Sequence, residues 1–170
     1  MKFPDNIRIR KAIPDDAESI VRIINPIIER GMESVQDLPY SAAFLKNQLE
    51  NLQPGTIYHV AELKKDNKMV GVAMVLPHIH NIPTTSHNAV LALFVDLNER
   101  GKGIGTLLCN QTLETAKKSG FENLQIYIRE DNLDLIAFGL KLGFGIIGTA
   151  MKQGKCYSKY INIIVMEKIL

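Results

Sequence analysis

The sequence predicts an α+β fold with a mixed central β-sheet flanked by helices, in a single domain over residues 1–170. The early strand-like segments follow one another as hairpins, whereas the later ones alternate with helical segments, and this combination is typical of a mixed sheet. A chain of 170 residues with 46% hydrophobic side chains suits one compact domain with a substantial core. No internal repeat, linker or low-complexity stretch divides it.

The first half of the chain contains three strand segments and two helical ones. Residues 7–10 alternate apolar and basic side chains, as in an edge strand. Pro14 and two aspartates begin a helix that Gly31 ends or bends. A second helix begins around Ser41 and should direct four side chains inward: Phe44, Leu45, Leu49 and Leu52. Residues 58–63 and 69–76 then form a hairpin.

The second half places a helix between two strands. A strand over residues 89–95 leads into a glycine-rich turn over Arg100–Gly105. A helix follows from about Thr106 to Lys118, and Gly120 ends it as a C-terminal cap. The remaining elements are a strand at 124–128, a helix at 132–142, and strands near 145–151 and 161–168.

Composition and charge exclude several classes of protein. The formal net charge of +2 gives little long-range attraction for nucleic acid. No apolar run approaches the roughly 20 residues that span a bilayer, and residues 1–16 contain none of signal-peptide length. Cys109 and Cys156 have neither metal-ligand spacing nor the look of a disulfide framework. We therefore expect a soluble, cytoplasmic protein with reduced thiols and without a membrane or nucleic-acid partner.

The glycine-rich turn is the most informative motif. Gly101, Gly103 and Gly105 lie within five positions, between a strand and a helix. Glycine lets the backbone approach a ligand closely, and the first N–H groups of a helix have no partner inside it. Such a turn therefore forms an anion site. Arg100 and Lys102 add positive charge where a pyrophosphate would bind.

Two common nucleotide motifs do not fit this turn. The P-loop pattern G-x-x-x-x-G-K-[ST] is absent. The dinucleotide pattern G-x-G-x-x-G fails because its third glycine falls on Thr106 or on Leu108. An ATP- or NAD-binding domain therefore remains only as a disfavoured alternative.

The spacing R-x-x-G-x-G, formed by Arg100, Gly103 and Gly105, closely resembles the acetyl-CoA motif of the GNAT superfamily of N-acetyltransferases. Residues 7–20 look like the family's first strand and helix, and residues 132–144 resemble its segment N-x-x-A-I-x-x-Y-x-K-x-G-F. These matches follow the family's order and cover nearly the whole chain. The resemblance implies a GNAT-like fold, acetyl-CoA as the acyl-donor substrate, and no metal.

The resemblance also implies a coenzyme site. Backbone N–H groups of Lys102–Thr106 should hold the pyrophosphate, and a splayed strand at Leu93–Val95 should pair with the pantetheine amides as an added strand would. The N–H of Val95 is expected to meet the thioester carbonyl. Asn132 matches a family asparagine that contacts the coenzyme, while a role as helix N-cap fits equally well. The expected coenzyme-binding residues are Leu93, Phe94, Val95, Arg100, Gly101, Lys102, Gly103, Ile104, Gly105, Thr106 and Asn132.

Two positions depart from the family pattern for acid and base. The tyrosine that commonly protonates the leaving sulfur falls on Gly139, and the strand at 90–95 carries no carboxylate to act as base. Three histidines in or beside the loop between two central strands are candidates for the base, with passive exposed side chains as the alternative: His78, His80 and His87. A metal site at these histidines lacks an obvious supporting carboxylate.

Other polar side chains leave alternatives open. Three tyrosines are candidates for the missing acid, although packing in a strand is the commoner fate: Tyr127, Tyr157 and Tyr160. Three acidic residues after the first helix either line the acceptor cleft or lie on a solvated surface: Glu29, Glu33 and Asp37. We interpret Cys109 as a core residue, since direct attack by a bound amine needs no enzyme nucleophile.

The sequence therefore predicts an acetyl-CoA-dependent N-acetyltransferase, an acyltransferase that moves an acetyl group to a primary amine by direct attack in a ternary complex. A small-molecule amine is the expected acceptor, and a protein N-terminus or lysine is the alternative. The glycine at position 139 leaves open a non-catalytic CoA-binding sensor module. A homodimer is possible by analogy with the family.

Overall fold

The computed structural model describes residues 4–31, 33–34, 38–78, 82–156 and 159–170. Its strands are β1 (Ile7–Lys11), β2 (Ile57–Leu63), β3 (Met69–Pro77), β4 (Asn88–Val95), β5 (Asn123–Arg129), β6 (Gly145–Cys156) and β7 (Lys159–Ile169). Its helices are α1 (Ala17–Glu29), α2 (Ala42–Glu50), α3 (Ile104–Lys118) and α4 (Leu133–Lys141). Short 3-10 helices are η1 (Pro14–Asp16), η2 (Pro83–Thr85) and η3 (Leu97–Glu99).

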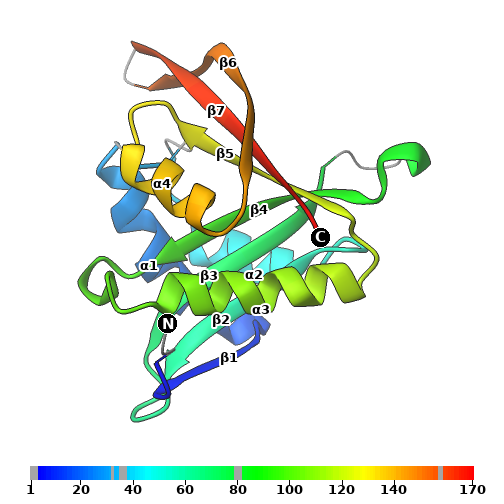
Figure 1. The fold of residues 1–170 in the computed structure, drawn as a ribbon. Coiled ribbons are helices and arrows are strands. Elements are labelled where there is room, and N and C mark those ends of the chain that lie inside the picture. The colour runs from blue at the N-terminus through cyan, green and yellow to red at the C-terminus, as the bar shows by residue number, and fades with distance from the viewer. Residues whose placement is uncertain (1–3, 32, 35–37, 79–81, 157–158) are drawn as a thin grey trace.

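The strands of the described residues form one sheet in the order β1-β2-β3-β4-β5-β7-β6. Every neighbouring pair is antiparallel except β4 and β5, which are parallel. The predicted mixed sheet is therefore confirmed, with α3 as the crossover between β4 and β5. Helices α1 and α2 cover one face and α3 and α4 the other (Figure 1). No helix in the described part of the chain is long and apolar enough to cross a membrane.

Apolar cores lie on both faces of the sheet. On one face Leu108 of α3 packs in a cluster with Ala73 of β3. On the other face Ile24 of α1 packs in a cluster with Val72, the neighbouring residue of the same strand. Successive side chains of a strand point to opposite faces, and both faces of the sheet are covered, so β2 and β3 bury nearly every side chain. The candidate site lies beside these buried strands.

Several element boundaries differ from the prediction, among them those of α3, β6 and β7. Helix α3 begins at Ile104, two residues early, because Gly103 adopts a left-handed φ of 81° and serves as its N-cap residue. Strand β6 extends to Cys156 and β7 begins at Lys159, so both are longer than predicted. Strand β6 lies at the edge of the sheet, where the polar side chains of Lys152, Gln153 and Lys155 are compatible with a strand.

Helix α2 buries a narrower face than predicted, and it ends at Glu50, before Leu52. Leu45 and Leu49 are buried, but Phe44 and Leu52 are 51% and 41% exposed. The expectation for these two side chains was wrong. Neighbouring residues of a helix lie about 100° apart around its axis. Because Leu45 points into the core, Phe44 points away from it. The ring of Phe44 stacks instead on Tyr40, with ring centroids 6.0 Å apart.

The sheet opens between its two parallel strands. Strands β4 and β5 pair only where Asn88–Val90 meets Asn123–Gln125. Beyond these residues β4 continues to Val95 and β5 to Arg129 without pairing to each other. Figure 1 shows the two strands separating toward their carboxyl ends. We call the resulting space the V-opening, and its narrow end, at Val90 and Gln125, the vertex.

Candidate active site

The glycine-rich turn lies at the carboxyl end of β4, at the wide end of the V-opening. Gly101 and Gly103 have φ values of 75° and 81°, which side chains with a Cβ rarely adopt. The first helical hydrogen bond of α3 runs from the N–H of Leu107 to the carbonyl of Gly103 (3.1 Å). The N–H groups of residues 104–106 precede that bond, so the helix itself does not use them. The turn therefore has the backbone geometry of an anion site.

The start of α3 lies against β4 and α4. A Cβ on Gly105 would lie 3.4 Å from Phe138 of α4 and 3.5 Å from Val95 of β4, which is ordinary van der Waals contact. Apolar side chains therefore border the turn at the wide end of the V-opening.

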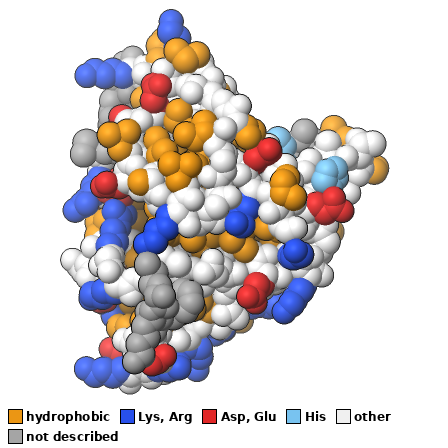
Figure 2. All heavy atoms as spheres, viewed as in Figure 1, with side chains coloured by type: hydrophobic (Ala, Val, Ile, Leu, Met, Phe, Trp, Pro, Cys, Tyr) orange, Lys and Arg blue, Asp and Glu red, His pale blue; other side chains and the backbone are white. Residues whose placement is uncertain are grey.

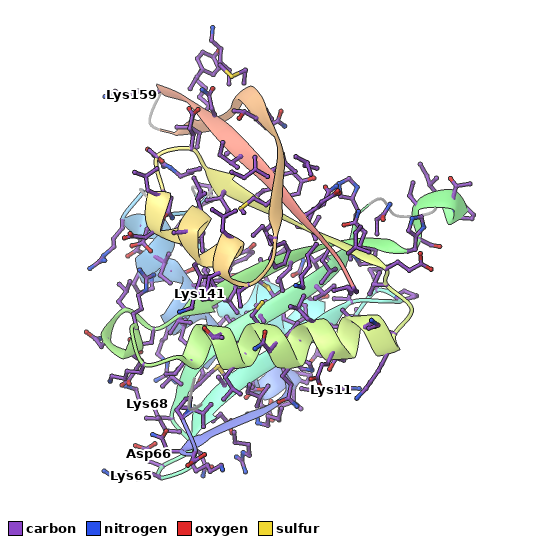
Figure 3. The ribbon with its side chains drawn as sticks, in the orientation of Figure 1. Lys11, Lys65, Asp66, Lys68, Lys141 and Lys159 are labelled. Atoms are coloured by element: carbon purple, nitrogen blue, oxygen red, sulfur yellow. The ribbon has the colours of Figure 1, made fainter. Side chains whose placement is uncertain are left out.

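The two cations of the turn are held in ion pairs. Arg100 Nη1 lies 2.6 Å from Glu33 Oε2, and Lys102 Nζ lies 2.7 Å from Glu99 Oε2. Lys68, labelled in Figure 3, also contacts Glu99 at 3.4 Å. The hydrogen bond from Lys102 is the main reason why the pKa of Glu99 lies below its usual value. These cations remain partly exposed, so an arriving phosphate can compete for them.

Residues that follow α1 connect the two arms of the V-opening. Glu33 reaches the β4 side through its ion pair with Arg100. On the β5 side, Arg129 donates from Nη1 to the carbonyl of Gly31, and Asn132 donates from Nδ2 to the carbonyl of Glu33 (3.4 Å). We call Gly31 and Glu33 the bridging residues. Glu33 therefore faces the site rather than open solvent, whereas Glu29 is exposed and Asp37 lies outside the described residues.

Asn132 occupies the N-cap position of α4. Its Oδ1 accepts a hydrogen bond from the N–H of Leu135 (3.1 Å), which is the capping role considered for it from the sequence. Its Nδ2 is the group that faces Glu33. The cap fixes the start of α4 beside the V-opening.

The free edge of β4 presents alternate backbone N–H groups to the V-opening. The N–H of Asp96 bonds to the carbonyl of Val70 on β3 (2.9 Å). Because the direction of N–H groups alternates along a strand, those of Val95 and Leu93 point away from β3 into the opening. The N–H of Phe94 points to β3, and its side chain packs with the α1 cluster. Of these three predicted residues, two therefore present backbone groups to the opening.

The structure brings His78 together with Tyr127. His78 Nε2 lies 2.8 Å from the hydroxyl of Tyr127, which also contacts Gln125 Oε1 at 2.9 Å. Burial raises the pKa of Tyr127 above its usual value. Gln125 forms part of the vertex, so this polar chain stands at the narrow end of the V-opening. The pattern of the sequence offered no sign of this contact, because its partners are 49 residues apart.

The other candidate acids and bases are placed differently. His87 accepts hydrogen bonds from Glu122 and Asn123 through its backbone carbonyl, and its imidazole makes no hydrogen bond to another described residue. His80 and Tyr157 lie outside the described residues. Tyr160 is 61% exposed at the end of the hairpin of β6 and β7, near the Lys159 labelled in Figure 3. Among the residues described, no cluster of three or more His, Cys, Asp or Glu side chains could hold a metal ion.

Gly139 is a packing position. A Cβ there would lie 3.0 Å from Met166 Sδ and 3.1 Å from Ile126 Cδ1, so these side chains fill the space that a tyrosine would need. Cys109 is buried in the α3 core, and burial raises its pKa to about 12, which confirms the interpretation as a core residue. A thiol that stays protonated at neutral pH is a poor nucleophile.

Comparison with known families agrees with this geometry. The family model described as the acetyltransferase (GNAT) family matches residues 20–144. The chain belongs to the GNAT family of acetyltransferases. This confirms the superfamily and the class of enzyme, an acyltransferase, that the sequence predicts.

Solved structures and a sequence relative extend the comparison. Ribosomal-protein-alanine N-acetyltransferase from Brucella melitensis is 26% identical, with a TM-score of 0.84 over 96% of this chain and 99% of that one. A phosphinothricin acetyltransferase from Sinorhizobium meliloti, solved in complex with acetyl-CoA, is 22% identical, with a TM-score of 0.87 over 97% and 89%. An uncharacterized N-acetyltransferase of Methanocaldococcus jannaschii is 38% identical over 80 residues, 46% of this chain. That match spans only 35% of the length of the relative.

Proposed function

We propose that the protein transfers the acetyl group of acetyl-CoA to a primary amine of a small molecule, by direct attack in a ternary complex. The observation that carries the proposal is the V-opening between β4 and β5, with the glycine-rich turn at its wide end. The related fold from Sinorhizobium meliloti, which holds acetyl-CoA, supports this donor.

The donor would lie along the free edge of β4. The backbone N–H groups of Lys102–Thr106 hold the pyrophosphate, and Arg100 and Lys102 exchange a carboxylate partner for a phosphate. The N–H of Val95, next to the turn, pairs with the pantetheine arm as an added strand would. The acetyl group lies further along this edge toward the vertex, so the N–H of Leu93 takes the place of that of Val95 as the proposed donor to the thioester carbonyl. Asn132 contacts the same coenzyme from the β5 side.

The chemistry requires a neutral amine beside the thioester. An ammonium ion first loses a proton to a base, and His78 is the histidine that we propose for this step because it lies at the vertex. The amine nitrogen then forms a bond to the carbonyl carbon, and the carbon–sulfur bond breaks. Holding both reactants in one site supplies much of the acceleration without any covalent enzyme intermediate.

A small acceptor is favoured by the bridging residues. Their hydrogen bonds to Arg129 and Asn132 hold Gly31 and Glu33 beside β5 even when Arg100 exchanges Glu33 for a phosphate, and the two residues narrow the approach from the α1 side. The Glu33 carboxylate also favours a cationic amine there. The Brucella melitensis relative supports the alternative, a protein N-terminus, because its name gives ribosomal-protein alanine as the acceptor. A CoA-binding sensor without turnover remains a further alternative.

The proposal also includes a homodimer. Strand β6 is one of the two edge strands of the described sheet, and exposed apolar side chains gather near it on α4 and β6 (Figure 2): Leu133, Leu140, Ile146 and Ile147. Light scattering at several concentrations tests this, with the mass of two chains expected.

The direct test of function is acetyl-CoA-dependent thiol release with a panel of amines. The panel contains amino acids, polyamines, aminoglycosides, and peptides that begin with alanine or contain lysine. Release with one class of small amine supports the proposal, whereas release with peptides alone assigns a protein acceptor. Thiol release no faster than hydrolysis, with acetyl-CoA binding intact by calorimetry, contradicts turnover and supports the sensor.

A further inference from the structure

The contact between His78 and Tyr127 crosses the amino end of β4. His78 directly follows β3, Tyr127 belongs to β5, and β4 lies between these two strands in the sheet. The N–H of His78 also bonds to the carbonyl of Asn88 (3.0 Å), which fastens the histidine backbone to β4. The two rings lie 6.4 Å apart with an angle of 27° between their planes. The pair therefore forms a bridge over one strand at the vertex.

The side chain of Tyr127 lies on the face of the sheet opposite to the proposed acetyl-CoA phosphate site. Leu124 and Ile128 of β5 pack in the core beneath α3, so the side chain of Tyr127 points to the face that carries α1. Tyr127 is two residues past Gln125, or about 6.6 Å along the strand from the vertex. The start of α3, which presents the anion site, lies on the other face. A thioester in the V-opening would thus have the coenzyme site on one side and the phenol on the other.

The hydroxyl of Tyr127 has two possible acceptors for its one proton. It donates to Gln125 Oε1 at 2.9 Å, and His78 Nε2 at 2.8 Å is the second acceptor when the histidine carries its proton on Nδ1. A rotation about the C–O bond moves the proton from one acceptor to the other. Burial keeps the pKa of Tyr127 above its usual value, so the phenol enters the reaction protonated.

We propose that Tyr127 is a catalytic residue that takes a proton from the acceptor ammonium while it passes its own phenolic proton to His78. This role rests on the acetyl transfer proposed above. The step converts R–NH₃⁺ and neutral histidine into R–NH₂ and imidazolium, and Tyr127 is unchanged. The amine then forms the N–C bond, the C–S bond breaks, and the second nitrogen proton passes to the leaving thiolate. His78 finally returns its proton to solvent.

The charged groups near Tyr127 on this face come from β5, from the residues that follow it, and from β7. Glu167 of β7 is the register partner of Gln125, and it accepts a hydrogen bond from Asn123 (3.1 Å). Arg129 lies further along β5, where Asp131 pairs with it at 2.7 Å. The charge of Arg129 is offset by that of Asp131, and Glu167 adds a carboxylate on the face of the sheet that carries Tyr127.

The test compares Tyr127→Phe with a control, Tyr58→Phe, which removes the hydroxyl of another tyrosine in a strand. The hydroxyl of Tyr58 on β2 also contacts a glutamine, Gln48 Oε1 at 3.4 Å, so the control removes the same atom elsewhere on the same face. With the best amine of the panel, Tyr127→Phe should lower kcat by at least about 100-fold, as loss of general acid–base catalysis does. The Kd for acetyl-CoA from calorimetry should stay at the wild-type value. Tyr58→Phe should retain the wild-type kcat.

Two further readouts test this role. The fall of kcat at low pH should disappear in His78→Gln, which a structural role would not cause. The ¹⁵N signals of the His78 ring should shift in Tyr127→Phe, which tests the contact between the two side chains. An active wild type with an unchanged kcat in Tyr127→Phe overturns the role of Tyr127 alone. A parallel loss of acetyl-CoA affinity assigns it a structural role and also overturns the proposal. A wild type that releases no thiol with any amine contradicts the acetyl transfer itself, and with it this role.

Discussion

The Nδ1 atom of His59 on β2 lies 3.0 Å from the hydroxyl of Thr112 on α3, and both residues are buried. Thr112 donates its own proton to the carbonyl of Leu108 (2.8 Å). The hydroxyl therefore accepts from His59, which places the histidine proton on Nδ1. Burial lowers the pKa of His59 below its usual 6.5, and the nearby charge of Lys11 lowers it further. The folded protein consequently holds His59 neutral.

This contact predicts loss of stability in mild acid. The folded state binds the His59 proton less tightly than the unfolded chain, so unfolding is favoured as the pH falls through 6.5. Stability attributable to neutral His59 is fully present above that pH. Urea titrations at pH 7.5 and 5.5 should show a larger fall in the free energy of unfolding for wild type than for His59→Gln. Equal falls in the two proteins would contradict the prediction.

The partner hydroxyl can be tested separately. Thr112→Val leaves the His59 N–H buried without an acceptor and should cost about 1–3 kcal/mol. The control is Thr115→Val. The hydroxyl of Thr115 donates a similar hydrogen bond to the carbonyl of Gln111 (3.0 Å), at a more exposed site on the same helix. Denaturant unfolding at neutral pH should show a change below about 0.5 kcal/mol for the control. Similar costs for both variants would show that the hydroxyl of Thr112 has no special role.

The order of helices and strands was predictable because it follows local patterns. Alternating and periodic apolar residues marked β1 through β5, and the glycines marked the turn before α3. The V-opening was implied only by the resemblance to a family, since a paired and an unpaired strand share one pattern. The contact of Arg100 with Glu33 and that of Arg129 with Gly31 had no local signal, because each joins residues more than 60 positions apart. Such contacts depend on the register of the sheet.

The glycine-rich turn predicts a specific loss of donor binding. Gly103→Asp places a carboxylate beside the proposed pyrophosphate site, so the Kd for acetyl-CoA should rise at least about 10-fold, which corresponds to about 1.4 kcal/mol. Gly120→Asp at the other end of α3 is the control, because Gly120 also has a positive φ, 92°, with no atom near its Cβ. Both variants should lose stability from backbone strain. Calorimetry should find weaker binding for Gly103→Asp only, and equal affinities would remove the turn as the phosphate site.

A charged cluster at the β1 edge of the sheet predicts a second loss of stability in acid. Arg10 bonds to Asp16 (2.6 and 2.8 Å) and to Glu62, which Arg8 also contacts at 2.7 Å. Burial raises the pKa of Glu62, but the bonds from Arg10 and Arg8 outweigh it and leave the pKa below its usual 4.5. The carboxylate therefore stabilises the fold above pH 4.5, and this contribution is lost as the pH falls through the lower folded value.

Glu62→Gln tests this cluster. Removing the carboxylate should cost roughly 1–3 kcal/mol, less than for a fully buried ion pair, because the Arg10 side chain is 30% exposed. Its free energy of unfolding should also depend less on pH below 4.5 than that of wild type. Glu114→Gln, at an exposed position of α3, is the control and should match wild type in both measurements. A Glu62→Gln protein as stable as the control would show that the cluster contributes nothing.

The packing of Gly139 predicts that the family's usual tyrosine cannot be restored at that position. Gly139→Tyr must displace Met166 and Ile126, whose atoms already lie 3.0 and 3.1 Å from the Cβ position. Overpacking by single methylene groups costs about 1–3 kcal/mol, so a whole phenol should lower the free energy of unfolding by at least about 3 kcal/mol. The control, Ala137→Tyr, adds the same side chain at an exposed position of the same helix and should change stability by less than about 1 kcal/mol. If Gly139→Tyr instead keeps wild-type stability and raises kcat, the space at position 139 can admit an acid. The proton chemistry would then belong to α4 and not to the pair of His78 and Tyr127 at the vertex.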